Sequence, residues 1–194
     1  MRSILRITQK GTGNMNMDAN SSDYDVSILR PAIYKNDITF RGRQLSDGDL
    51  SKVKKSLRTL HSLEIMATNI YRFQMTGRQD DLNKELLAAM CNEQTHISDF
   101  LVRLYEYGLT PSPLRGMWWI AGFIFGFGSR ILGKKAVLTI GVWVESKAVH
   151  HYEELLKAAP WDEATYKTIA KDQADERGHI HTWQTMLKHL ENSK

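Results

Sequence analysis

Two Glu-x-x-His motifs give this sequence its clearest potential for metal chemistry, because carboxylates and imidazoles are common metal ligands. The first motif is Glu93-Gln94-Thr95-His96, and the second is Glu176-Arg177-Gly178-His179. Residues three apart on a helix project to the same side, so each motif can present both of its ligands to one site. One such motif is weak evidence, since it also occurs on solvated helix faces, but a pair of them is more specific.

Four long segments with helical apolar periodicity carry these motifs. They cover about residues 46–77, 80–107, 134–158 and 162–190. Alternate steps of three and four residues along each segment trace the seam that faces the core of a helical bundle. Each seam is apolar at both ends and has one glutamate near its middle, and two seams add a histidine: Glu64, Glu93, His96, Glu145, Glu176 and His179.

Four glutamates at one level of a buried core create an electrostatic conflict that a multivalent cation removes. Ionised carboxylates are costly in a dry core, and neighbouring carboxylates raise one another's pKa. One Glu from each of two helices, plus Glu-x-x-His from each of two others, is the ligand set of di-iron and di-manganese bundles. The alternative is that these acids lie on exposed faces and pair with Lys or Arg, which requires the seam assignment to fail in all four helices.

Polar residues beside the motifs are candidates for hydrogen bonds to the histidines. A metal-bound histidine usually donates its other ring N–H to a carboxylate or a carbonyl group. Asp175 and Asn92 each precede a motif glutamate and can reach a histidine on a facing helix, and Asp172 lies one turn before Glu176. The alternative for each is an ordinary solvated side chain.

The connections between the segments predict the topology. Short connections join the first helix to the second and the third to the fourth, which makes each pair antiparallel. The wide gap between the second and third helices fits a long crossover. We therefore predict an all-α, ferritin-like four-helix bundle over residues 46–190 with an apolar helical crossover between helices 2 and 3. Residues 1–45 are expected to form a flexible or irregular arm.

Composition limits the remaining classes of protein. The 194 residues are 42% hydrophobic and 25% charged, as in an ordinary globular domain. The net charge of +4 is too small to identify a partner, and we expect no nucleic acid. A single cysteine, Cys91, excludes an internal disulfide and a Cys-x-x-Cys metal site. No secretory signal is visible near the first residues, so we expect a reducing compartment.

The apolar stretch Met117–Gly128 has two interpretations. It is shorter than the roughly 20 residues that span a bilayer. Its large side chains are either buried in the bundle or in a dimer interface, or they form an interfacial helix that enters one leaflet. The adjacent Trp118 and Trp119, with Arg and Lys on either side, favour the membrane interface.

The motifs resemble those of the demethoxyubiquinone hydroxylases of ubiquinone biosynthesis, a ferritin-like family, over about residues 50–190. The resemblance rests on five segments: His61-Ser62-Leu63-Glu64 with Ile70-Tyr71, Glu93 to His96, Val144-Glu145 with His151-Tyr152, Asp175 to His179, and Trp119-Ile120-Ala121-Gly122-Phe123 through Leu132-Gly133-Lys134. The first of these matches only loosely, and residues 1–45 match nothing in the family.

The resemblance implies a function and a ligand set. It implies an O₂-dependent di-iron monooxygenase that hydroxylates the ring of a demethoxyquinone or quinol, with electrons from outside and NADH as a candidate reductant. The implied iron ligands are the six seam residues, with His151 and Tyr152 near the substrate. The implied partners are a polyprenyl quinone, O₂, the membrane surface through residues 117–128, and further copies of the chain. The expected location is peripheral, on the cytoplasmic side of a membrane.

Three alternatives stay open from the residues alone. A bacterioferritin-like ferroxidase or iron-storage bundle uses the same ligand pattern, although the apolar insertion is awkward on the surface of a cage. A rubrerythrin-like peroxidase lacks the cysteines of a rubredoxin centre. A quinone- or lipid-binding scaffold would need no metal. The ligand set itself accepts manganese as well as iron.

Overall fold

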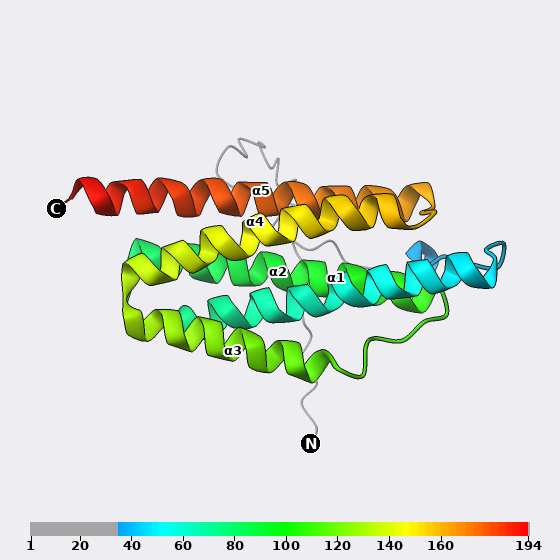
Figure 1. The fold of residues 1–194 in the computed structure, drawn as a ribbon, viewed down its shortest axis with the longest axis horizontal. Helices are drawn as coiled ribbons and strands as arrows, with labels where there is room; N and C mark the ends of the chain where they lie inside the picture. The colour runs from blue at the N-terminus through cyan, green and yellow to red at the C-terminus, as the bar shows by residue number, and fades with distance from the viewer. Residues whose placement is uncertain (1–34, 194) are drawn as a thin grey trace, which may run out of the picture.

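The computed structural model describes residues 35–193, which form helices joined by short connections (Figure 1). A short 3₁₀ helix, η1 (Lys35–Asp37), precedes five α-helices: α1 (Asp47–Gln74), α2 (Asp81–Glu106), α3 (Arg115–Leu132), α4 (Lys134–Ala158) and α5 (Glu163–Asn192). The described residues contain no β-strand, and the predicted all-α, ferritin-like bundle is confirmed. The greater part of the predicted arm, residues 1–34, lies outside the described residues.

Side-chain caps set the start of three of the long helices. The side chain of Ser46 accepts a hydrogen bond from the backbone N–H of Asp49 at 3.1 Å. Asp80 and Asp162 cap α2 and α5 in the same way. Such caps satisfy N–H groups that have no partner inside the helix, so the sequence predicts these starts well. α1 ends at Gln74, earlier than the predicted end near residue 77, because the next residue is extended.

The helices form two antiparallel pairs and a crossover. In Figure 1, α1 and α2 run side by side in opposite directions, as do α4 and α5, which cover them. α2 and α4 run in the same direction, so the chain must return along the bundle between them. α3 makes this return, as the long gap in the helical pattern predicts, and the structure shows that it lies against α1.

Two apolar clusters fill the bundle and leave a polar layer between them. One contains buried residues from the start of α1 and the end of α2, such as Leu57 and Phe100. The other contains residues from the opposite ends of these helices, such as Tyr71 and Leu86. The seam glutamates and histidines lie in sequence between the two clusters on each helix. The ends of the bundle therefore supply the apolar packing that holds the central layer in place.

Two glycines allow α3 to approach α1 closely. A Cβ atom on Gly122 would lie 2.5 Å from the carbonyl oxygen of Met66, and one on Gly126 would lie 2.5 Å from that of Ile70. The contact buries only small residues of α3 and leaves its large ones outside. The exposed side chains include Met117, Trp119, Ile120, Phe123, Ile124, Phe125, Phe127, Ile131 and Leu132.

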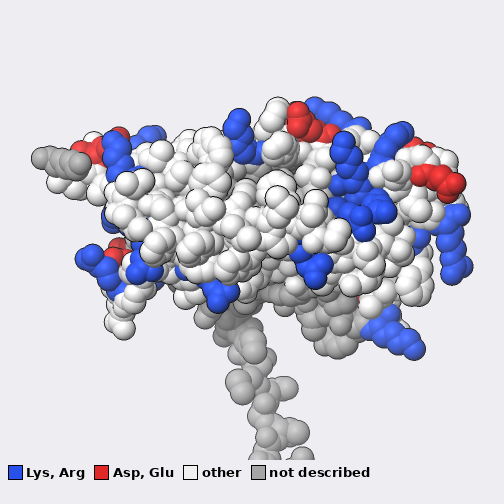
Figure 2. Space-filling view, turned by 60° about the horizontal axis from the view of Figure 1, so that its bottom comes forward, with Lys and Arg blue, Asp and Glu red and all other residues white. Residues whose placement is uncertain are grey.

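The surface around α3 combines apolar and basic side chains. Figure 2 turns the lower side of Figure 1 forward and shows a broad area without charged side chains, with Lys and Arg spaced around it. The structure therefore disagrees with the interpretation that the large side chains of residues 117–128 are buried in the bundle. No helix among residues 35–193 has the length and apolar character needed to cross a bilayer.

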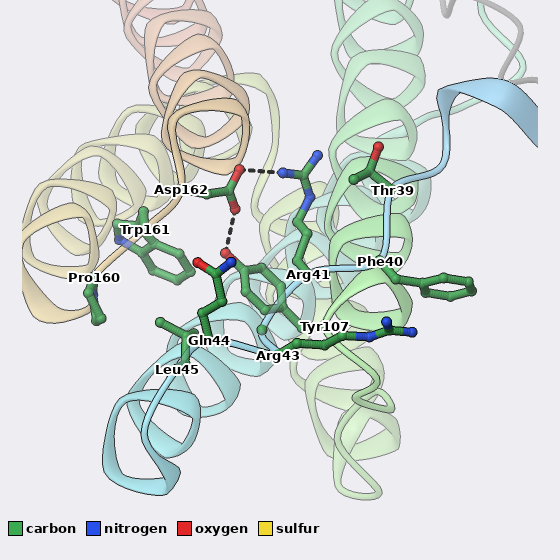
Figure 3. Close-up of a pocket in the computed structure, with 11 residues that line it drawn as sticks. Thr39, Phe40, Arg41, Arg43, Gln44, Leu45, Tyr107, Pro160, Trp161 and Asp162 are labelled. Atoms are coloured by element: carbon green, nitrogen blue, oxygen red, sulfur yellow. Dashed lines mark hydrogen bonds and ion pairs between the residues drawn. The ribbon is translucent and has the colours of Figure 1, made fainter.

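The segment before α1 is fastened to one end of the bundle. The backbone N–H of Thr39 and the side chain of Arg41 both donate hydrogen bonds to the Glu106 carboxylate, at 2.8 and 2.7 Å. Arg41 also contacts Asp162, which accepts a hydrogen bond from the Tyr107 hydroxyl at 2.5 Å (Figure 3). Residues 39–45 therefore connect the end of α2 to the start of α5.

Candidate metal centre

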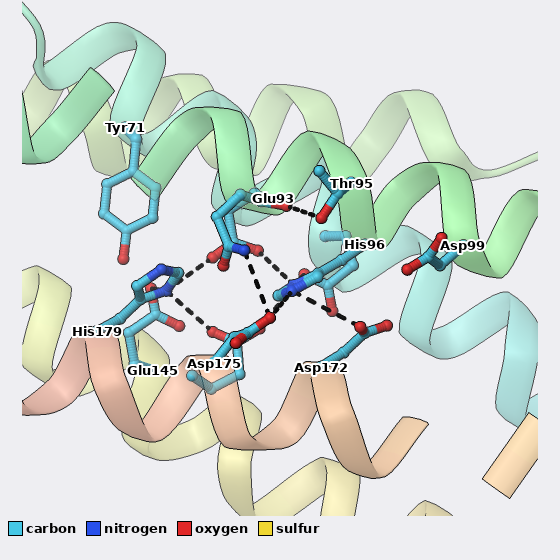
Figure 4. A network of polar contacts seen from close by, with 12 residues as sticks. Tyr71, Glu93, Thr95, His96, Asp99, Glu145, Asp172, Asp175 and His179 are labelled. Carbon is cyan, nitrogen blue, oxygen red and sulfur yellow. Dashed lines mark hydrogen bonds and ion pairs between the residues drawn. The ribbon is translucent and has the colours of Figure 1, made fainter. Parts of the chain in front are cut away.

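The six seam residues converge in the polar layer at the middle of the bundle. They come from four helices, with Glu64 on α1, the first Glu-x-x-His motif on α2, Glu145 on α4 and the second motif on α5 (Figure 4). All four glutamates and His96 are buried, and the side chain of His179 is 15% exposed. The alternative in which these acids lie on exposed faces disagrees with this burial.

The first group of ligand atoms is centred on His96. Its Nδ1 atom lies 3.7 Å from Glu64 Oε2, 3.5 Å from Glu93 Oε2 and 3.2 Å from Glu176 Oε1. One ligand atom from each of these four residues lies within 4.8 Å of the other three. Such a group of one imidazole and three carboxylates can surround one metal ion.

The second group is centred on His179. Its Nδ1 atom lies 3.1 Å from Glu93 Oε1, 3.4 Å from Glu176 Oε2 and 3.7 Å from Glu145 Oε1. These atoms also lie within 4.8 Å of one another. Glu93 and Glu176 belong to both groups and offer a different oxygen to each. The two groups therefore form a pair of adjacent sites with two shared carboxylates.

Burial and charge set the pKa values of the carboxylates in this layer. Burial, together with the neighbouring Glu93, raises the pKa of Glu64 well above its ordinary value. Burial and the charge of Glu176 do the same to the pKa of Glu145. Burial opposes ionisation of Glu93 as well, but contacts with His179 and His96 lower its pKa below the ordinary value. Protons and imidazolium charge thus balance the acids when no cation is present.

The ligand residues of the cluster fit a metal ion by an independent criterion, because most of their buried polar atoms have no hydrogen-bond partner. Buried polar atoms nearly always have a hydrogen-bond partner. Within residues 35–193, both carboxylate oxygens of Glu93, Glu145 and Glu176 are buried without a hydrogen bond, as are the Nδ1 atoms of both histidines. A cation would use these lone pairs as ligands.

Acids on α5 contact the far side of the His96 ring. Its Nε2 atom lies 3.2 Å from Asp175 Oδ2 and 3.8 Å from Asp172 Oδ1. Asn92 donates a hydrogen bond to the same Asp175 oxygen at 3.4 Å. Asp175 thus occupies the position from which a carboxylate orients a histidine ligand, as its place before Glu176 suggests. Asn92 acts on Asp175, and Lys171 forms an ion pair with Asp172 at 3.1 Å.

Tyr152 and His151 lie in different environments although they are adjacent. The Tyr152 hydroxyl is fully buried and donates a hydrogen bond to Glu64 Oε1 at 2.6 Å. The His151 side chain is 46% exposed and its Nδ1 atom lies 3.4 Å from Glu154. Tyr152 therefore reaches the ligand cluster, whereas His151 lies nearer the surface of the protein.

An apolar pocket of about 470 Å³ leads to the cluster between α1, α3 and α4. Glu64 and Glu145 line it, together with Met66, Trp118, Ala121, Phe125, Trp143, Lys147 and His151. Trp143 and Lys147 lie off the seam of α4, so the seam pattern gave no reason to select them. Their role in the pocket depends on the position of α3, which local sequence does not specify.

The fold and the cluster define a class of protein, the ferritin-like helical bundles with carboxylate and histidine side chains across the core. Comparison with known sequences narrows this class. Residues 51–191 match the family described as ubiquinone biosynthesis protein COQ7. The match includes all six residues of the cluster. The chain belongs to this family, that of the demethoxyubiquinone hydroxylases, as the motifs predict.

Several curated proteins are similar to the chain. A protein of Dictyostelium discoideum named NADPH-dependent 3-demethoxyubiquinone 3-hydroxylase, mitochondrial, is 30% identical over 66% of this chain and 62% of its own length. A 3-demethoxyubiquinol 3-hydroxylase of Legionella pneumophila (strain Lens) is 27% identical over 71% of this chain and 66% of its own. One of Paracidovorax citrulli is 29% identical over 71% and 70%. The chain thus spans just under two thirds of the first two relatives.

Proposed function

We propose that the chain is an O₂-dependent di-iron hydroxylase that adds one oxygen atom to the ring of a demethoxyquinol in ubiquinone biosynthesis. The observation that carries this proposal is the pair of adjacent ligand groups, which share Glu93 and Glu176 and border an apolar pocket. The names of the related hydroxylases support the reaction and its substrate. One atom of O₂ enters the ring and the other leaves as water, with two electrons and two protons from outside; NADH is the candidate reductant.

The two ligand groups support a proposal in which each group holds one metal ion. Glu64 and His96 would hold one ion and Glu145 and His179 the other, and Glu93 and Glu176, which belong to both groups, would supply ligands to both. Two iron ions held there would supply the electrons that activate O₂ for insertion of one oxygen atom into an organic substrate.

The apolar pocket would bind the quinol ring beside the cluster. Its walls include Trp118, Phe125 and Trp143, which offer flat apolar surfaces to an aromatic ring and exclude water from the reacting atoms. Besides the two glutamates, Lys147 and His151 line the pocket, and both can contact the oxygen substituents of the ring. His151 is therefore proposed to bind substrate.

Tyr152 is proposed to be a positioning residue. Its hydroxyl donates to Glu64 Oε1, and Tyr152 is not among the residues that line the pocket. The hydrogen bond fixes one carboxylate oxygen and leaves the other, Oε2, on the side of His96. Loss of such a supporting hydrogen bond typically lowers metal affinity or activity by about 10- to 100-fold.

The exposed face of α3 is proposed to rest on a membrane surface. Its large apolar side chains would enter the headgroup region, with nearby Arg and Lys at the phosphates, on the cytoplasmic side. One wall of the substrate pocket consists of Trp118, Ala121 and Phe125, which belong to this same helix. A polyprenyl tail could then stay in lipid while the ring enters the pocket.

Turnover with labelled oxygen tests the function. Metal-loaded protein is incubated with a reductant, a short-tailed demethoxyquinol and isotopically labelled O₂. The mass of the product is then measured by mass spectrometry. We expect one labelled oxygen atom in the ring and about two metal ions per chain, the number that the two ligand groups imply. Unlabelled product, or no product from protein that holds both metals, would contradict the proposal.

Matched variants assign the residues. Glu145→Gln should lose one metal and the product, whereas Glu153→Gln, an exposed acid on the same helix, should keep both. Tyr152→Phe should lower turnover by about 10- to 100-fold at unchanged KM. His151→Ala should raise KM instead. Full turnover by Glu145→Gln would refute its assignment as a ligand.

A further inference from the structure

A second pocket, of about 660 Å³, lies between α1, α2 and the start of α3, and the proposed reaction makes no use of it. It shares no lining residue with the apolar pocket or with the metal cluster. Two arginines line it, Arg72 of α1 and Arg115, the first residue of α3. No Asp or Glu is among its lining residues, so its electrostatic character is positive.

Neither arginine is neutralised by a neighbouring acid. Within residues 35–193, no carboxylate oxygen lies within 4.0 Å of either guanidinium group, although nine other Lys and Arg residues there form such ion pairs. The Arg72 guanidinium lies over the Phe73 ring, 5.7 Å from its centroid, and Arg115 donates only to the Ser112 carbonyl at 3.5 Å. Most of their N–H donors are therefore available to an anion.

Further hydrogen-bonding groups lie in the same pocket. Gly116, in the first turn of α3, lines it, and Leu114 provides no side-chain cap for that helix end. The backbone N–H groups of Arg115 and Met117 already donate to the carbonyl oxygens of Ser112 and Leu114, at 3.2 and 2.9 Å. The N–H of Gly116 lies between them, and an N–H group at a helix start attracts anions. Thr68 also lines the pocket; it is 7% exposed, and its Oγ1 atom has no hydrogen-bond partner among the described residues. An uncapped helix start, two unpaired arginines and a buried unpartnered hydroxyl thus meet at one place.

An aromatic row leads away from this pocket along the outside of α3. Trp119 lines the pocket and stacks on Phe123, with ring centroids 6.2 Å apart, and Phe123 stacks on Phe127 at 5.6 Å. All three side chains are exposed. A ligand that fits both features has an anionic head and an apolar chain.

We propose that this pocket binds the phosphate of an acidic phospholipid, whose acyl chains lie along Trp119, Phe123 and Phe127. Arg72 and Arg115 contact the phosphate oxygens, and the backbone N–H of Gly116 at the start of α3 completes the site. The row of exposed rings makes a lipid the better match than a soluble phosphate, because a soluble phosphate leaves those rings in water. The site needs neither metal nor quinone, so its test is independent of the proposed reaction.

Calorimetric titration of the full chain at fixed ionic strength measures this binding. The probes are monomeric dihexanoylphosphatidylglycerol and inorganic phosphate. We expect saturable binding of the lipid, and binding at least about 10-fold weaker for inorganic phosphate, which lacks the apolar chains. The variant Arg72→Gln/Arg115→Gln should bind the lipid about 10- to 30-fold more weakly than the wild type. Lys54→Gln/Lys55→Gln, which removes the same charge from an exposed part of α1, should bind as the wild type does.

Each remaining outcome overturns the proposal. Equal lipid affinity of the wild type and the arginine variant would show that the pocket is not the site. An equal loss in the lysine variant would assign the effect to diffuse charge. Inorganic phosphate that binds as tightly as the lipid would assign the pocket to soluble phosphates. Circular dichroism checks that the variants fold, and the two single arginine substitutions replace the double one if it does not.

Discussion

Replacing Glu145 with leucine should separate the stability of this protein from its capacity to hold metal. Glu145 is fully buried, and neither of its carboxylate oxygens has a hydrogen bond within the described residues. Burial and the charge of Glu176 raise its pKa well above the ordinary value. In the metal-free protein this side chain is therefore a buried polar group without a hydrogen bond, and its Oε1 atom lies 3.7 Å from His179 Nδ1.

The expected gain in stability follows from that environment. A buried polar group without a partner costs about 1–3 kcal/mol, and exchange of buried charged groups for apolar ones is often neutral or stabilising. His179 loses one contact but keeps Glu93 at 3.1 Å and Glu176 at 3.4 Å. We expect Glu145→Leu to raise the free energy of unfolding of the metal-free protein by about 1–3 kcal/mol. The Tm should rise by about 2–4 °C for each kcal/mol.

With metal bound, we expect the wild type to be more stable than Glu145→Leu. A ligand that binds only the folded state stabilises it by about 2.7 kcal/mol at a free concentration 100-fold above Kd. The wild type should gain at least this much from ferrous or manganous ion, and Glu145→Leu should gain far less because one ligand group is incomplete.

Urea denaturation followed by circular dichroism measures both states, with chelator and with anaerobic ferrous salt. Glu153→Leu is the matched control, since Glu153 is an exposed acid on the same helix with an ion pair to Lys157 at 2.8 Å. It should respond to metal as the wild type does. A metal-free Glu145→Leu protein that is less stable than the wild type, or an equal gain from metal in both, would refute the reasoning.

Two further predictions concern packing and pH. Gly126→Ala should destabilise the fold by about 1–3 kcal/mol because its Cβ would lie 2.5 Å from a backbone oxygen of α1, whereas Gly128→Ala, with open space around it, should not; thermal melts compare them. Burial opposes ionisation of Glu106, but hydrogen bonds from the Thr39 N–H and from Arg41 lower its pKa below the ordinary value. The ionised group therefore stabilises the fold at neutral pH, and this contribution is lost as the pH falls below about 4.3 toward the folded pKa. Glu106→Gln should be less stable than the wild type at pH 7, with a difference that shrinks in acid; a constant difference in urea titrations would contradict this.

Some features of the site follow from local sequence. A helix repeats its direction about every three to four residues, so Glu93 and His96 must share a face wherever the helix packs. The apolar positions on either side of each glutamate then identify that face as the buried one. The starts of α1, α2 and α5 are local as well, since a side chain at the cap bonds an N–H two or three residues ahead.

Contacts between residues far apart in the sequence decided which other side chains support the cluster. The Tyr152 hydroxyl reaches Glu64 across 88 residues of sequence, and Asp175 reaches His96 across 79. No periodicity relates such positions, because their distance depends on how whole helices pack.

The sequence by itself determined which side chains form the cluster, since helical geometry and apolar patterning act within a few residues. The tertiary structure decided what surrounds it. α3 meets α1 through Gly122 and Gly126, and this contact turns large side chains outward, forms one wall of the apolar pocket and brings Arg115 and Arg72 to the lining of one pocket. The apolar pattern of α3 was compatible with burial or exposure, and only the close fit of two backbones selected between them.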